Sequence, residues 1–248
     1  SLQGWWKLDA SATFDGSNWS IPDDSSNSNT GTSSGMTAAN LVQSTLNITT
    51  PYSRYALDFD GTNDYIELAS SSTAITDWTQ PYTISMWVNY TSSLSFDLMA
   101  TFGVETGSAA TSRYIMIGGS SGYLFTGVGD TDGGSTDIHF NIGSNLNDGN
   151  WHNIVYIGDG TSGDFPTVYV DSVLKTYSGG TTNLFNSSSY LNVIGTGSTA
   201  AGRYFPGKIS NVSIWNAALT SAQITELYNQ RKPSNLNNHS AYSNLSSW

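Results

Sequence analysis

The sequence predicts an all-β protein in which two antiparallel sheets pack as a sandwich, with one short helix near the C-terminus. Short segments rich in Thr, Val, Ile and Tyr recur along the chain, and clusters of Gly, Asn, Asp and Ser separate them. This alternation of strand formers and turn formers is typical of an all-β domain. Aromatic residues make up 12% of the 248 residues, which supplies large side chains for a core. About a dozen strands in one chain favour two packed sheets.

The predicted strands follow one another along most of the chain. They are Trp5–Leu8, Tyr55–Phe59, Tyr65–Leu68, Tyr82–Tyr90, Leu98–Phe102, Tyr114–Ile117, Tyr123–Thr126, Ile138–Ile142, His152–Ile157, Thr167–Val170, Val173–Thr176, Leu191–Ile194 and Lys208–Trp215. Only Asp171 and Ser172 separate two of these strands, which predicts a two-residue hairpin turn.

The segment from Tyr82 to Asn89 alternates most clearly between apolar and polar residues. Ile84, Met86 and Val88 fall on one face of such a strand. Trp87 falls on the other face, among polar residues. We therefore expect the face that carries Trp87 to be partly covered, or to be a contact surface.

One helix is predicted, from about Ser221 to Gln230. Thr220 and Gln223 have the spacing of a capping box, in which each side chain bonds a backbone N–H at the helix start. Pro233 cannot continue a helix, so the helix has to end before it.

The domain is expected to cover residues 1–232. Residues 233–248 are rich in Ser and Asn and are predicted to form an extended tail. Such a tail could begin a further repeat or contact another subunit.

Charge excludes several classes of partner. The chain has 8 Lys and Arg against 19 Asp and Glu, a formal net charge of −11. Nucleic acids and anionic membrane surfaces are bound through clustered basic residues, so both are poor candidates here. No apolar run approaches the ~20 residues that a membrane-spanning helix needs, so no membrane insertion is expected. The chain has no Cys and can form no disulfide.

Four segments in order carry a resemblance to a known family. They are Leu57–Ile66 (LDFDGTNDYI), Tyr82–Val88 (YTISMWV), Asp148–Ile154 (DGNWHNI) and Phe205–Asn216 (FPGKISNVSIWN). Together they resemble the laminin-G-like and pentraxin-like branch of the concanavalin-A-like lectin/glucanase superfamily. The resemblance covers most of residues 5–230 and implies a jelly roll of two curved antiparallel sheets.

The C-terminal part carries a second, shorter resemblance. The segments Ile224–Asn229, Lys232–Leu236 and Tyr242–Trp248 look like laminin-G-like proteins of marine bacteriophages. This resemblance implies a virion structural or fibre protein, and hence an extracellular or virion-surface location.

Catalysis is not expected. Glycoside hydrolases need two carboxylates on either side of the scissile bond. The chain has three Glu residues, Glu67, Glu105 and Glu226, and no predicted strand holds two of them. His152 is expected to be a packed residue at the start of a strand. Glycoside hydrolysis is therefore the less favoured alternative to binding.

A calcium site is implied by resemblance rather than by the residues alone. The segment Asp23–Gly31 (DDSSNSNTG) resembles a family loop that often helps to hold a structural calcium ion. Carried over, the ligands are Asp24, Asn27 and Asn29, whose side chains offer the oxygen atoms that calcium prefers. The alternative is a polar turn that satisfies its own hydrogen bonds. Ser210 stands where relatives often have Asp, which counts against the metal.

Carbohydrate binding is the favoured function. A sugar needs an aromatic ring for its apolar face and hydrogen-bonding groups for its hydroxyls. The candidates are Trp87, Asn89, Arg113, Tyr114, Tyr123, His139 and Tyr204. Packing in the core or at an edge is the alternative role for each of them. We expect an adhesion module that binds a glycan or a surface protein. The alternative is a structural or decoration subunit of a viral or cell-surface assembly, forming a homo-oligomer or meeting a tandem-repeat neighbour.

Overall fold

The computed structural model describes residues 2–46, 54–68, 81–104, 113–120, 123–129, 135–141, 146–159, 166–182, 192–196, 203–230, 232–233 and 235–242. Strands make up most of the described residues. Helix α1 (Ser221–Tyr228) and the short 3-10 helices η1 (Ala38–Asn40) and η3 (Leu236–Asn238) accompany them. The described residues contain no helix that is both long and apolar enough to cross a membrane.

Sheet A forms one layer of the protein. Its strands are β1 (Leu2–Trp6), β5 (Leu41–Gln43), β6 (Tyr55–Asp60), β8 (Tyr82–Asn89), β13 (His152–Gly158), β14 (Thr167–Val170), β17 (Pro206–Trp215) and the first part of β15 (Val173–Thr182). They pair in the order β5–β6–β17–β8–β13–β14–β15, all antiparallel, and β1 lies beside β6 along the same edge of β17.

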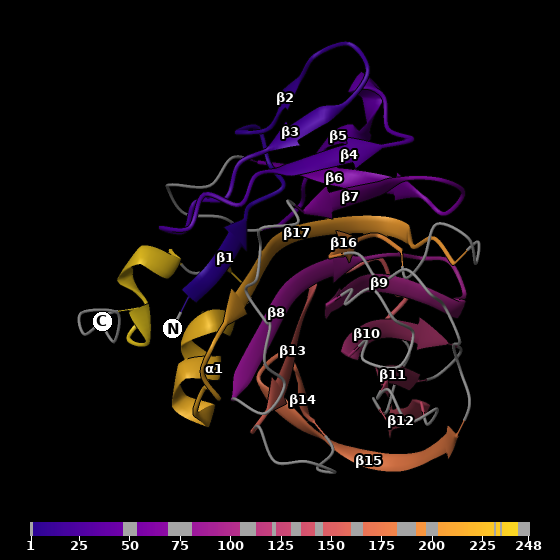
Figure 1. Cartoon of the computed structure of the whole chain (residues 1–248), viewed down its shortest axis with the longest axis vertical. Helices are drawn as coiled ribbons and strands as arrows, with labels where there is room; N and C mark the ends of the chain where they lie inside the picture. Colours follow the sequence, from indigo (N-terminus) through magenta and orange to yellow (C-terminus); the bar gives the residue numbers. More distant parts are fainter. Residues whose placement is uncertain are drawn as a thin grey trace.

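Sheet B forms the second layer. Its strands, in spatial order, are β2 (Thr13–Phe14), β3 (Trp19–Ile21), β4 (Gly31–Ser34), β7 (Tyr65–Leu68), β16 (Val193–Ile194), β9 (Ser95–Val104), β10 (Arg113–Ser120), β11 (Tyr123–Gly129) and β12 (Ser135–Asn141). The second part of β15 pairs with β12, so this long strand joins the two sheets. Figure 1 shows β17, β8, β13, β14 and β15 as an arc around β9–β12. The predicted two-sheet antiparallel sandwich is confirmed.

The main core lies between the two sheets. Ile84, Met86 and Val88 of β8 belong to it, as their alternation predicted, and they are fully buried. Ile66 and Phe102 contribute from sheet B. Each such side chain stabilises the fold by about 1.5–3 kcal/mol when it leaves water.

A second core covers the outer face of sheet A. It consists of Leu2, Trp5, Val155, Ile157, Trp215, Leu219, Ile224, Leu227, Leu236 and Ala241. Helix α1 contributes two of these residues and lies outside the arc of strands in Figure 1. The helix begins with the predicted capping box of Thr220 and Gln223, and it ends at Asn229, whose φ of 41° turns the chain out of the helix.

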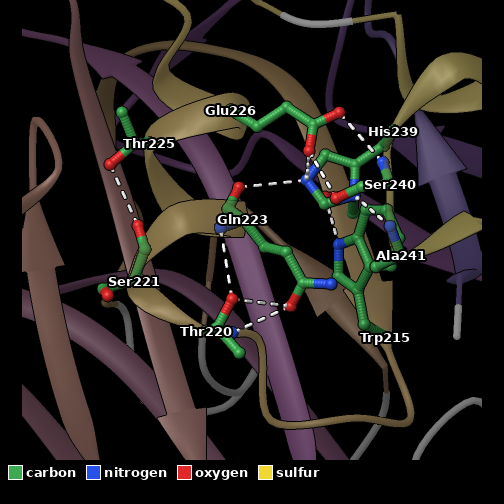
Figure 2. A network of polar contacts seen from close by, with 10 residues as sticks. Trp215, Thr220, Ser221, Gln223, Thr225, Glu226, His239, Ser240 and Ala241 are labelled. Carbon is green, nitrogen blue, oxygen red and sulfur yellow. Dashed lines mark hydrogen bonds and ion pairs between the residues drawn. The ribbon is translucent and has the colours of Figure 1, made fainter.

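Residues 235–242 fold back onto α1 and are held there by His239 (Figure 2). Its Nε2 donates to the carbonyl oxygen of Gln223 (3.0 Å), and its Nδ1 accepts from the N–H of Ala241 (3.1 Å). This pattern corresponds to the tautomer protonated at Nε2. The ring also packs on Trp215, with 4.8 Å between ring centroids. The described part of the predicted tail is therefore packed rather than extended, and residues 243–248 lie outside the described residues.

The remaining differences concern short elements. The sequence analysis missed β2, β3, β4 and β5, because these strands are brief and lie in or next to Ser-rich and Thr-rich segments. The predicted turn at Asp171 and Ser172 is present, and both residues have the positive φ of a tight hairpin turn, 52° and 61°.

Candidate functional site

The seven residues predicted to bind a ligand are divided between the two sheets. Trp87 and Asn89 lie in β8 of sheet A, whereas Arg113, Tyr114, Tyr123 and His139 lie in β10, β11 and β12 of sheet B. Tyr204 pairs with Leu98 at an isolated bridge beside β9. The set therefore does not form one site.

Trp87 and Asn89 are buried and contact other residues of the protein. Trp87 is 1% exposed, and its ring stacks on that of Tyr228 at a centroid distance of 5.9 Å and an angle of 9°. Asn89 is 7% exposed, and its amide donates to the carbonyl oxygen of Gly149. We expected both side chains to be exposed for contact with a ligand, and their burial does not match this expectation. The alternation in the sequence identified the face on which Trp87 lies, but it could not identify the helix that covers this face.

Three of the predicted residues share one face of sheet B. Phe125 of β11 pairs with His139 of β12, and Tyr123 lies two residues before Phe125 on β11. Positions two residues apart in a strand share a face, so the positions of Tyr123 and His139 lie on the same face of these adjacent strands. Tyr114 pairs with Gly129 and takes the same face. Ile115 and Leu124, at the alternate positions, are buried in the main core. The backbone positions of Tyr114, Tyr123 and His139 thus gather on the outward face of sheet B, and Arg113 falls at an alternate position.

A shallow hollow of about 430 Å³ lies at another part of the same sheet, over β4 and β7. We call it the strand hollow. Thr30, Thr32, Ser34, Tyr65 and Glu67 line it. The register brings Ser34 opposite Tyr65 and Thr32 opposite Glu67. The buried Thr101 and Val193 separate this hollow from the group on β10–β12.

Sequence reasoning missed the strand hollow because its members come from two strands that are distant in the chain. Hydroxyl residues at the alternate positions Thr30, Thr32 and Ser34 were the available signal. The arrangement sets a phenol ring beside three hydroxyl groups and one carboxylate. These groups can bind the apolar face and the hydroxyls of a sugar.

The loop interpreted as a calcium site is organised by Asp23 rather than by Asp24. One carboxylate oxygen of Asp23 accepts from the backbone N–H of Trp5 (2.8 Å) and of Ser25 (2.9 Å). The other oxygen accepts from the Ser25 hydroxyl (2.9 Å) and the Asn29 N–H (2.8 Å). Both carboxylate oxygens of Asp23 thus face hydrogen-bond donors. The partial positive charge on the donor hydrogens would repel a cation.

The predicted calcium ligands have other partners. Asp24 pairs with the ammonium group of Lys7 at 2.6 Å. The side-chain amide of Asn27 donates to the backbone carbonyl oxygen of Gln3 (2.8 Å). The backbone carbonyl oxygen of Asn29 accepts from the Trp6 indole (2.7 Å). No cluster of acidic and histidine side chains that could hold a metal occurs among the described residues. Because calcium needs six to eight oxygen ligands around one point, these contacts favour the alternative of a polar turn that satisfies its own hydrogen bonds.

His152 lies between two carboxylates. Its Nδ1 is 2.8 Å from Asp171 and its Nε2 is 3.1 Å from Asp148. Burial lowers the pKa of His152, but the hydrogen bonds and charges of Asp171 and Asp148 outweigh it and raise the pKa above its ordinary value. Asp171 also accepts from the N–H of Asn153 (2.9 Å). The histidine therefore ties the start of β13 to the β14–β15 turn, as a packed residue.

The chain belongs to the concanavalin A-like lectin/glucanases superfamily, whose laminin-G sequence profile matches residues 60–225. No curated protein sequence matches the chain. The family assignment agrees with the resemblance of the four sequence segments.

Solved structures with the same fold include binding domains. The receptor-binding domain of botulinum neurotoxin mosaic serotype C/D superposes with a TM-score of 0.61 at 12% identity, covering 93% of this chain and 51% of the toxin domain. Domain 4 of an extracellular arabinanase from Geobacillus stearothermophilus, solved with arabinotriose, gives 0.60 at 20% identity, covering 92% and 98%. The binding domain of Paraclostridial Mosquitocidal Protein 1 gives 0.60 at 15% identity, covering 92% and 52%. The chain thus spans about half the length of the two toxin domains. At these identities the likeness establishes the fold.

The first prediction concerns calcium. Removing divalent ions with a chelator, or adding millimolar calcium, is expected to leave the melting temperature unchanged, because the oxygens of the Asp23 loop already have partners. An ion present at 100 times its dissociation constant would raise the melting temperature by about 5–10 °C. Differential scanning calorimetry with calcium, with magnesium as a control, checks this. A saturable rise with calcium alone would contradict it.

The second prediction concerns pH. The raised pKa of His152 in the folded protein means that its stabilising contribution is complete below the ordinary value of about 6.5 and is lost as the pH rises through the higher folded value. Relative to His152→Gln, the native protein should be more stable by about 1 kcal/mol or more near pH 6, and by less near pH 9. Urea unfolding of both proteins at the two pH values measures this. A difference that stays constant or grows with pH would rule out the double ion pair.

Proposed function

We propose that this protein is a non-catalytic carbohydrate-binding module that acts in adhesion outside the cell or on a virion. The observation that carries the proposal is the outward face of sheet B. There the register gathers the positions of Tyr114, Tyr123 and His139, and the strand hollow sets Tyr65 beside hydroxyl groups. The superfamily membership, and the arabinanase domain solved with arabinotriose, support a sugar as the ligand.

Composition supports a neutral ligand for such a face. Charged residues are only 11% of the chain, and the surface relies on Ser, Thr and Asn for polarity. Neutral hydroxyl and amide groups can both donate and accept, which matches the hydroxyls of a sugar. An aromatic ring adds apolar contact area for the C–H face of the sugar.

The acidic residues support binding without catalysis. Glu226 is held by Ser240, whose N–H and hydroxyl donate to the two carboxylate oxygens at 2.9 and 2.6 Å. Asp64 accepts from the N–H of Asp60 and from the Asn40 amide, so it braces a turn. Glu67 lies in the strand hollow, and Glu105 lies outside the described residues. Because a glycosidase needs two cooperating carboxylates, we propose that the module binds its sugar without cleaving it.

A structural role in a surface assembly is the second candidate. Val173 and Leu174, directly after the β14–β15 turn, are 57% and 55% exposed. Large exposed apolar side chains favour contact with another protein, and as successive residues of a strand these two point to opposite faces of sheet A. A second copy of this chain or a scaffold would bury them.

The third prediction tests sugar binding. A glycan array is expected to identify at least one neutral oligosaccharide, and Tyr65→Ala should weaken its binding about tenfold because the sugar loses a ring contact. Tyr55→Ala is the matched control, since Tyr55 is a similarly half-buried tyrosine on sheet A. Isothermal titration calorimetry compares the two variants. Silence of the native protein across neutral, acidic and host-surface glycans would refute the proposed function.

A further inference from the structure

The geometry points to a second carbohydrate-binding site, on the opposite side of the sandwich from sheet B. A groove of about 560 Å³ lies between the C-terminal end of α1, the β14–β15 turn and η3. We call it the helix groove. It is lined by one phenol ring, several side-chain amides, hydroxyl groups and one carboxylate. A second site goes beyond the proposed function, but its class of ligand, a carbohydrate, rests on the proposed function.

Tyr228 gives the helix groove a rigid aromatic platform. Trp87 lies behind it, with the two rings nearly parallel at an angle of 9°. Trp87 is itself fixed on β8 in a small cluster with Leu46, Ala56 and Trp151. The ring of Tyr228 is therefore held in place from one face, and Tyr228, which is half-buried, is among the residues that line the groove. A ring that is already immobile loses little entropy when a sugar stacks on it.

Amide side chains surround this platform. Asn229 and Gln230 follow the helix with φ angles of 41° and 54°, a left-handed conformation that is uncommon outside glycine. The turn that they form places both residues on the groove wall instead of continuing the helix. Asn238 of η3 and Asn235, the residue that caps η3, also line the groove. Amides can donate and accept at once, so these side chains can bind the hydroxyls of a sugar.

The carboxylate of the helix groove points to a neutral sugar. Glu226 lines the groove and is anchored by the N–H and hydroxyl of Ser240. A fixed carboxylate can accept from a sugar hydroxyl, but it repels a sugar acid. The net charge of −11 acts in the same direction. We therefore assign the groove to a neutral oligosaccharide.

Two sites on opposite faces would change what the module does. The helix groove lies over the outer face of sheet A, whereas the strand hollow and the positions of Tyr114, Tyr123 and His139 lie on the outward face of sheet B. Such a module could hold two glycan chains at once. Multivalent attachment raises the overall affinity well above that of either site.

The test uses arabinotriose and cellotriose as neutral probes in isothermal titration calorimetry. The native protein is expected to bind two equivalents of at least one probe. The double variant Gln230→Ala/Asn238→Ala should weaken one of the two sites by about tenfold or more, because two hydrogen bonds are lost. Asn237→Ala is the matched control, since Asn237 is an exposed amide in η3 that does not line the groove.

Tyr228 supplies the second readout. Tyr228→Phe keeps the stacked ring and should retain the site, whereas Tyr228→Ala should lose it while sheet B still binds. Circular dichroism melting establishes that each variant is folded. Binding of one equivalent that none of these groove variants alters would overturn the inference and leave the proposed function standing. No binding of any sugar by the native protein would overturn both.

Discussion

Both faces of sheet A carry large side chains that are buried, and the need to cover both faces determines the rest of the architecture. Every residue of β8 is buried, with Ile84 turned to the main core and Trp87 to the opposite face. A two-layer sandwich can bury only one face of each sheet. Helix α1 and residues 235–242 supply the third layer, through Leu227, Leu236 and the His239 contacts with Trp215. The C-terminal segment is therefore part of the fold.

This third layer also decides which parts of sheet A reach the surface. It removes Trp87 from the surface, although this residue type suits sugar binding. It leaves the outward positions of sheet B uncovered by the helical layer, and it creates the helix groove along its own margin. Trp87 keeps an indirect role, because it supports Tyr228 from beneath. In both places the polar groups are mainly hydroxyls and amides.

The sequence predicted the features that depend on local patterns. The alternation in β8, the capping box at Thr220 and the two-residue turn at Asp171 each follow from a short stretch of chain. The features it missed depend on contacts between distant segments. Asp23 organises its loop because Trp5 and Asn29 present N–H groups to it. The strand hollow and the helix groove are likewise each assembled from separate elements, so no single sequence motif predicts them.

If the helical layer is part of the fold, it should unfold together with sheet A. Residue-resolved amide hydrogen exchange can test this, because it measures the free energy needed to open each hydrogen bond. Amides of Ile224 in α1 and of Tyr242 beyond η3, both bonded to backbone carbonyls, should open with nearly the same free energy as those of β8. Protection in β8 combined with rapid exchange throughout α1 and residues 235–242 would contradict the claim.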